Sequence, residues 1–131
     1  MSLRISGAQA KRLGLTAKPK KPENRHAAET ARRALIDMYC RAHGIEPPDY
    51  EVRFHPTRMW RADMCFQGWL MVEQEGLAQG GGRHQRIAGF LEDLDKYNAM
   101  TVLGYRLLRF TRKQIDSGVA FQTIKEALGQ L

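Results

Sequence analysis

Three carboxylates lie close together in the middle of the chain, at Asp63, Glu73 and Glu75. Glu73 and Glu75 follow an apolar run and stand two residues apart, so their side chains point to the same face if the segment is a β-strand. A turn near Gln67 and Gly68 would place Asp63 on the preceding strand, opposite a residue near position 72 or 73. We therefore expect the three carboxylates to converge.

Such a group of carboxylates is costly to bury without a cation. Like charges raise one another's pKa and oppose ionisation, and a divalent ion removes the repulsion. Hard oxygen ligands without a full Cys/His set favour Mg²⁺ or Mn²⁺ over zinc, and either ion can lower the pKa of a water molecule that attacks phosphorus. The residue types also allow a simpler interpretation, in which the same acids are solvent-facing strand residues paired with neighbouring arginines.

Further groups that could act on a phosphate follow the carboxylates. His84 comes after the run Gly80–Gly82, which could bring its imidazole over the acids to take a proton from water; it could equally be a surface-loop histidine. Lys96 either pairs with Glu92 at the i, i+4 spacing of a helix or reaches the carboxylate site. Arg109 lies on the last expected strand, where it either contacts phosphate or is solvated.

Apolar periodicity and turn residues predict the elements that must position these groups. The strands are expected over residues 50–56, 58–67, 69–75 and 105–111. The helices are expected over residues 7–13, 24–43, 87–103 and 112–130, the second beginning with Asn24 as its N-cap. Apart from the short first helix, the order helix, strand, strand, strand, helix, strand, helix indicates an α/β fold with a mixed central sheet between flanking helices.

The helix over residues 87–103 carries apolar residues at helical spacing, and we expect this stripe to be its buried face. Its members are Phe90, Leu91, Leu94, Tyr97 and either Met100 or Thr101. Cys40 and Cys65 lack CxxC spacing and no secretion signal is visible, so free thiols in a reducing compartment are expected rather than a disulfide or a zinc site. No apolar run is long enough to cross a membrane.

Positive charge is concentrated at the start of the chain. Residues 1–33 hold nine Lys and Arg against two acids, whereas residues 34–131 hold twelve of each sign. We expect residues 1–23, with Lys18, Lys20 and Lys21, to form a basic arm and linker, and residues 24–131 to form one domain. Such an arm suits a polyanion such as DNA, although a solvated tail would have the same composition.

The motifs in this order resemble small phage and prophage nucleases of the PD-(D/E)XK, restriction-endonuclease-like superfamily. The matching segments are "RADMCF", "WLMVEQEG", "GGGRH" and "DLDKYNAMTVLGYRLLRFT", and the pattern is most similar to the very-short-patch-repair-like branch. The resemblance covers about residues 51–128 and implies a three-layer core around the mixed sheet. It also implies a cytoplasmic protein of a bacterial host, encoded by a phage or prophage, and it makes a homodimer an expectation although no residue pattern marks an interface.

The resemblance implies a Mg²⁺- or Mn²⁺-dependent DNA endonuclease. Asp63 looks like the central metal ligand, Glu73 like the second, and Glu75 like an additional ligand in the slot where the family usually has lysine. His84 looks like the histidine that acts near the attacking water, and the missing cation must come from Lys96 or Arg83. The acid in the lysine slot favours an alternative, a catalytically degenerate nucleic-acid-binding module with the same fold; a structural phage-assembly protein is a third hypothesis.

Overall fold

The computed structural model describes residues 22–76 and 82–129, without the side chains of residues 22, 23, 83 and 85. The chain divides into two units, Met1–Arg32 and Arg33–Leu131, and the second unit holds the sheet. The boundary between these units lies inside helix α2 (Pro22–His43). Asn24 lies within this helix, so its predicted role as N-cap is wrong, and the predicted helix over residues 7–13 lies outside the described residues.

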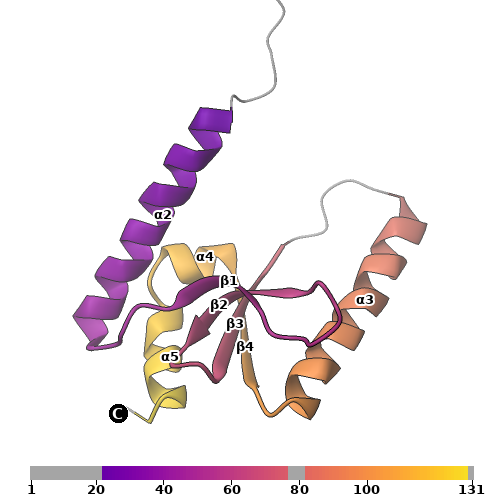
Figure 1. Ribbon diagram of the computed structural model, residues 1–131. Coiled ribbons are helices and arrows are strands. Elements are labelled where there is room, and N and C mark those ends of the chain that lie inside the picture. Colours follow the sequence, from indigo (N-terminus) through magenta and orange to yellow (C-terminus); the bar gives the residue numbers. More distant parts are fainter. Residues whose placement is uncertain (1–21, 77–81, 130–131) are drawn as a thin grey trace, which may run out of the picture. The chain divides into compact units, whose positions relative to one another are not determined.

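Four strands form one mixed sheet in the order β1-β2-β3-β4 (Figure 1). They are β1 (Asp49–Arg53), β2 (Arg61–Phe66), β3 (Leu70–Glu75) and β4 (Arg106–Thr111). The first three are antiparallel neighbours, and β4 pairs in parallel with β3. A parallel pair needs a long crossover, which helix α3 (Arg83–Val102) supplies. The predicted α/β class with a mixed sheet and flanking helices is confirmed.

A tight turn sets the register between β2 and β3. Gln67 and Gly68 both have positive φ, 53° and 77°, and the Trp69 N–H donates to the Phe66 carbonyl at 3.2 Å. Two left-handed central residues make a type I′ turn, whose twist matches that of the flanking strands. Because a slip of one residue would move every side chain to the other face, this turn decides which acids share a face.

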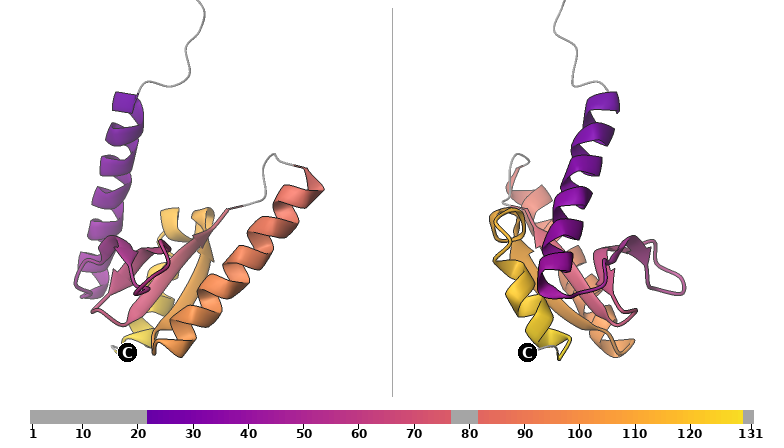
Figure 2. Two further views of the ribbon diagram at one scale, coloured as in Figure 1. Left: turned by 45° about the vertical axis from the view of Figure 1, so that its right-hand side comes forward. Right: turned by 90° about the vertical axis from the view of Figure 1, so that its left-hand side faces the viewer.

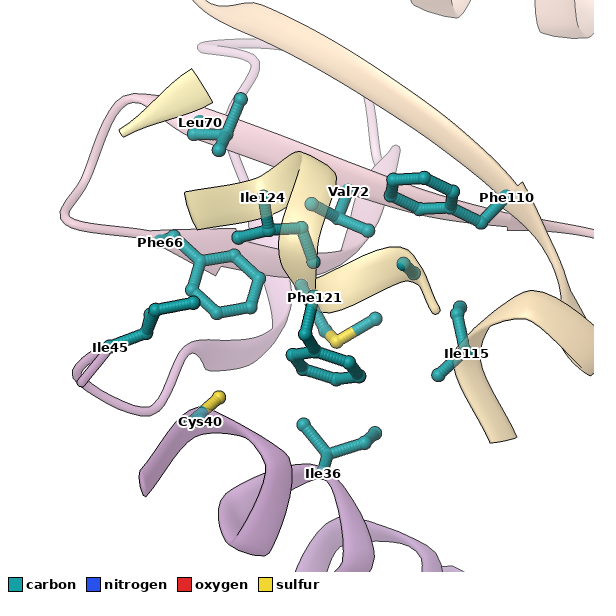
Figure 3. Close-up of a cluster of buried hydrophobic side chains, with 12 residues drawn as sticks. Ile36, Cys40, Ile45, Phe66, Leu70, Val72, Phe110, Ile115, Phe121 and Ile124 are labelled. Carbon is teal, nitrogen blue, oxygen red and sulfur yellow. The ribbon is translucent and has the colours of Figure 1, made fainter. Parts of the chain in front are cut away.

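One face of the sheet is covered by helices that come from distant parts of the sequence. Ile36 and Cys40 of α2 pack with α4 (Arg112–Asp116) and α5 (Ala120–Ala127) against side chains of β2, β3 and β4. Figure 3 shows Phe121 of α5 at the centre of this cluster. The predicted last helix is thus divided in two, because Gly118 turns the chain with a φ of +85°.

Helix α3 covers the opposite face (Figures 1 and 2). Its residue Met100 is fully buried and Tyr97 is half-buried, and both pack with Cys65 and Met71 of the sheet. Helices on both faces give the three-layer arrangement expected of such a sheet. Among the described residues, no helix combines the length and the apolar character needed to span a bilayer.

The two cysteines lie in different clusters. Cys40 belongs to the cluster with α4 and α5, and Cys65 to the cluster under α3. Both thiols are free and buried, as the sequence predicted. Burial raises the pKa of both, that of Cys40 to about 11, so neither is a reactive thiolate at neutral pH.

The predicted buried stripe of α3 is partly wrong. Phe90, Leu91 and Leu94 are 62%, 54% and 41% exposed, while only Tyr97 and Met100 of the stripe contact the sheet cluster. The helix is rotated so that its residues near Lys96 and Met100 face the strands. Only the C-terminal half of α3 contributes to the sheet-facing cluster, through Tyr97, Ala99 and Met100.

Replacing Gly118 should test the packing of α4 and α5 on α2. A Cβ at Gly118 would overlap the ring of Tyr39, which stacks on Phe121 at 5.2 Å and donates a hydrogen bond to the Asp116 carbonyl. We expect Gly118→Ala to lower the free energy of unfolding by about 3 kcal/mol, from the overlap plus the left-handed backbone. The measurement is urea denaturation followed by circular dichroism.

Gly44→Ala is the matched control for this prediction. Gly44 also has a positive φ, +68°, but a Cβ there would meet no atom within 4 Å. The free energy of unfolding of Gly44→Ala should therefore fall only by the cost of the left-handed backbone, about 1–2 kcal/mol. Equal losses in the two variants would contradict the proposed contact with Tyr39.

Candidate active site

A pair of carboxylates forms where β2 and β3 separate. Met64 pairs with Val72, so Asp63 and Glu73 hold the next opposed positions on the two strands. Beyond this point the Asp63 carboxylate takes the place of a backbone acceptor, because its Oδ2 accepts the Gln74 N–H at 2.8 Å. Asp63 is half-buried and Glu73 is only 4% exposed. The sequence prediction that Asp63 lies opposite position 72 or 73 is confirmed.

Lys96 of α3 neutralises this pair from above the sheet. Its Nζ lies 2.5 Å from Glu73 Oε1, and the two side chains are 16% and 5% exposed. Lys96 points to the strands because it shares a helix face with Met100, one turn further on, which is anchored in the cluster below. The carboxylate site and the helix are thus joined by a buried ion pair.

Glu92 is not the partner of Lys96, so the helix-stabilising interpretation of these two residues is wrong. The Glu92 carboxylate accepts hydrogen bonds from Trp60 Nε1 at 2.7 Å and from Arg58 at 2.9 Å. Arg58 also stacks over the Trp60 ring at 4.0 Å. Glu92 therefore ties α3 to the loop before β2 and leaves Lys96 for the site.

The Glu73 carboxyl is strongly perturbed. Burial raises its pKa to about 8, and the neighbouring Asp63 adds to the rise, while Lys96 opposes it. A buried acid beside a second acid is the arrangement in which a cation or a proton is most strongly favoured. Near neutral pH this group stands close to the point where it gains or loses its charge.

Glu75 belongs to a separate cluster. Its Oε1 accepts hydrogen bonds from Tyr97 at 2.7 Å and from Arg109 at 2.6 Å, and Arg109 lies over the Tyr97 ring at 4.4 Å. In the part of the chain that the structure describes, no three His, Cys, Asp or Glu side chains form a group that could hold a metal ion. The predicted convergence of three carboxylates is therefore wrong, since Asp63 and Glu73 come together without Glu75.

The cluster around Glu75 has the opposite electrostatic character. Burial tends to raise the pKa of Glu75, but the hydrogen bonds from Arg109 and Tyr97 outweigh it and hold the pKa below its usual value. Burial and the Glu75 carboxylate raise the pKa of Tyr97, and the bond to Glu75 raises that of Arg109. The pKa of Glu75 is thus lowered while that of Glu73 is raised, although both lie on one face of β3.

The other predicted site residues lie apart from the carboxylate pair or are not described. His84 is exposed in the first turn of α3, twelve residues before Lys96, which is about 18 Å along a helix axis. Its predicted position near the carboxylates is therefore wrong. The side chain of Arg83 and all of Lys18, Lys20 and Lys21 lie outside the described residues.

Tyr97 and Arg109 are the two site residues that sequence reasoning missed. The apolar pattern predicts Tyr97 only as a core residue, and the sequence allows Arg109 either a phosphate contact or solvation. A signal was present in the strands, because Glu73 pairs in register with Arg109 across the parallel β3 and β4. Finding it required the knowledge that these strands are neighbours, which residue spacing does not provide.

Comparisons with protein-family models, with curated proteins and with solved structures found no match to this chain. The chemistry of the site therefore rests on its own geometry. Two adjacent carboxylates, one buried with a raised pKa, offer the hard oxygen donors of a Mg²⁺ or Mn²⁺ site, and Mg²⁺ commonly uses only one or two protein carboxylates plus waters. The donor set of Asp63 and Glu73 fits such an ion.

The raised pKa of Glu73 predicts that this group makes folding less favourable as pH rises. Between its ordinary value near 4.5 and about 8, the folded state binds more protons than the unfolded state, so the free energy of unfolding falls with increasing pH. Glu73→Gln is a mimic of the protonated acid and lacks this pH dependence. We therefore expect the difference in the free energy of unfolding between the variant and the unmutated chain to shift by about 3 kcal/mol in favour of the variant as the pH rises from 5 to 8.

Glu75→Gln is the control, because the pKa of Glu75 is lowered. Its stabilising contribution is present above the unfolded pKa and is lost as the solution becomes more acidic. The two variants should thus diverge from the unmutated chain in opposite pH ranges, as measured by denaturation at each pH. A pH-independent difference for Glu73→Gln would contradict the assignment.

Proposed function

We propose that the protein is a Mg²⁺- or Mn²⁺-dependent endonuclease that hydrolyses DNA phosphodiester bonds. The observation that carries the proposal is the buried pair of Asp63 and Glu73 at the point where β2 and β3 separate, with Lys96 held against it. Two acids on neighbouring strands and a lysine from the helix that covers them are a suitable set for phosphoryl chemistry, which needs a metal ion and a positive charge beside it. The resemblance in the order of the motifs points to the same reaction.

Asp63 and Glu73 are the residues that would hold the divalent cation. When bound, the ion would activate water and offset negative charge on the phosphate. The fit is electrostatic: Glu73 is too buried to stay ionised on its own, since its pKa is about 8, and a cation favours its charged form. Asp63 keeps one oxygen on the Gln74 N–H, which fixes the orientation of its carboxylate.

Lys96 supplies the positively charged side chain that is missing at position 75, where the family usually has lysine. Glu75 fills that slot, but Tyr97 and Arg109 occupy its oxygen, so Glu75 serves in the proposal as a positioning residue and not as a metal ligand. Lys96 comes instead from α3 and meets the same carboxylate pair. Arg109, half-exposed and held by Glu75, is a second fixed positive group that can contact a phosphate.

The charge of the chain supports DNA as the substrate. The net charge is +7, and all of the excess lies in residues 1–33. Binding through Lys and Arg releases counterions from DNA, so the affinity should fall steeply as salt increases. This excess of basic residues supports non-specific contacts with the DNA backbone.

A catalytically degenerate nucleic-acid-binding module is the second candidate. It is favoured by one observation, that Lys96 already neutralises Glu73 directly. In such a protein the ion pair would be structural and no metal would be needed. The two candidates differ in metal binding and in cleavage, while both bind DNA.

The cleavage prediction is tested with plasmid, linear and branched DNA in the presence of Mg²⁺ or Mn²⁺. We expect cleavage that requires the metal, and we expect Asp63→Asn and Lys96→Ala each to lower the rate by roughly 100-fold or more. Asn at position 63 keeps an acceptor for the Gln74 N–H, so the fold is retained. Glu126→Gln removes an exposed carboxylate on α5 and should cleave at the unmutated rate.

Isothermal calorimetry separates the two candidates. For the nuclease we expect Mn²⁺ to bind at up to millimolar concentration, with binding lost in Asp63→Asn and kept in Glu126→Gln. A chain that retains DNA but binds neither Mn²⁺ nor Mg²⁺, and cleaves none of the three substrates, is the degenerate module. That result would overturn the enzymatic proposal.

A further inference from the structure

Two arginines face each other across the end of the β1–β2 hairpin. Arg53 ends β1 and Arg61 begins β2, and the register of the two strands places them directly opposite. Both are exposed, and within the described residues neither forms an ion pair with an acid. Arg53 donates a hydrogen bond to the sulfur of Met59, which is a weak acceptor. Like charges at opposed positions of an antiparallel pair destabilise a sheet, so this pair favours a bound anion.

A bend turns this end of the hairpin toward the face of the sheet that carries the acids. Tyr50 packs in the cluster with α2, α4 and α5, whereas Val52 packs in the cluster under α3. Residues two apart on a regular strand share a face, and the φ of +50° at Glu51 breaks this alternation. On β2, Met64 and Ala62 likewise pack in different clusters. The hairpin beyond Glu51 therefore bends toward α3 (Figure 1).

The loop that joins the two arginines is held by aromatic and polar contacts. Phe54 stacks with Trp60 at 6.4 Å between ring centroids, and His55 Nδ1 accepts the Arg58 N–H at 2.9 Å. Glu92 of α3 accepts hydrogen bonds from Arg58 and Trp60, so the loop is also fixed to the helix. A preorganised loop loses little conformational freedom when the arginines beside it bind a ligand.

The strand directions place cationic groups on both sides of the carboxylate pair. The ends of β1, β3 and β4 and the start of β2 all lie at one edge of the sheet. Arg53 and Arg61 are on one side of the pair there, and Arg109 of β4 is on the other. β1 and β4 are three strand spacings apart, about 14 Å, which about four nucleotides of a DNA strand span at roughly 3.4 Å each.

We propose that Arg53 and Arg61 form a binding site for backbone phosphate of the DNA substrate, beside the carboxylate pair. A phosphate between them replaces the repulsion of two like charges with charge-assisted hydrogen bonds, for which the planar guanidinium group is well suited. This site rests on the proposed function, because DNA is its ligand. Neither arginine belongs to the proposed metal site, so the phosphate contacts can be measured without metal and without cleavage.

The test is the fluorescence anisotropy of a short labelled DNA duplex, titrated with the full chain in EDTA over a series of salt concentrations. We expect Arg53→Ala and Arg61→Ala each to weaken binding roughly fivefold at physiological salt. Each variant should also reduce the slope of log affinity against log salt by about one, since one charged contact to phosphate is lost.

Arg106→Ala is the matched control, because it removes the same charge from an exposed arginine of the same sheet. Arg106 begins β4 and therefore lies at the opposite edge. The strand is six residues long, so the two edges are about 20 Å apart, beyond the Debye length of about 8 Å at physiological salt. The control variant should bind the duplex with the affinity and the salt slope of the unmutated chain.

Arg61→Glu separates a binding role of the arginine pair from a structural role. The substitution places an acid opposite Arg53, and opposite charges at such a position stabilise a sheet. We expect the midpoint of urea denaturation to rise while binding of the duplex weakens by roughly tenfold or more. If the arginine pair only supported the fold, the midpoint would fall instead.

Three outcomes would overturn the proposed phosphate site. The first is an unmutated chain that binds the duplex while Arg53→Ala and Arg61→Ala bind it equally well, which leaves the nuclease proposal intact. The second is an equal loss of affinity in Arg106→Ala, which means that only the net charge matters. The third is an unmutated chain that binds no duplex even at low salt, and this result alone also removes the proposed function.

Discussion

The buried carboxylate of Glu73 is the constraint on which the rest of the site depends. At 4% exposure and opposite Asp63, it cannot be ionised without help, and its pKa near 8 reflects that cost. Lys96 offsets part of the cost at 2.5 Å. Removing one partner of such a pair leaves an uncompensated charge, so the helix that carries Lys96 is held against the strands by electrostatics as well as by packing.

Two acids on the same face of β3, only two positions apart, have different surroundings. Glu73 is enclosed by Asp63 and Lys96, whereas Glu75 lies toward the strand end with Tyr97 and Arg109. Adjacent carboxylates of unlike pKa are a recurrent basis for division of labour in catalytic sites. Here the difference arises because burial dominates at Glu73, while charge-assisted hydrogen bonds dominate at Glu75.

Helix α3 therefore has three tasks along its length. Its C-terminal half packs Met100 and Tyr97 into the sheet cluster, its inner side holds Lys96 against the acids, and its N-terminal half carries exposed apolar side chains. Glu92 connects the helix to Trp60 and Arg58 ahead of β2. A single crossover helix thus connects the sheet cluster, the candidate active site and an exposed apolar surface.

Local chemistry in the sequence determined the elements, the type I′ turn after Phe66 and, through the resulting register, the opposition of Asp63 to Glu73. It determined these features because strand alternation and turn residues act over a few positions. Only the tertiary structure decided that Glu75 turns to Tyr97 and Arg109, that Lys96 leaves Glu92 for Glu73, and that His84 lies far from the acids. These contacts depend on the rotation of α3 about its own axis and on the pairing of β4 with β3. Both are set by packing between residues distant in sequence, and the apolar periodicity of α3 was ambiguous because the helix has two apolar sides.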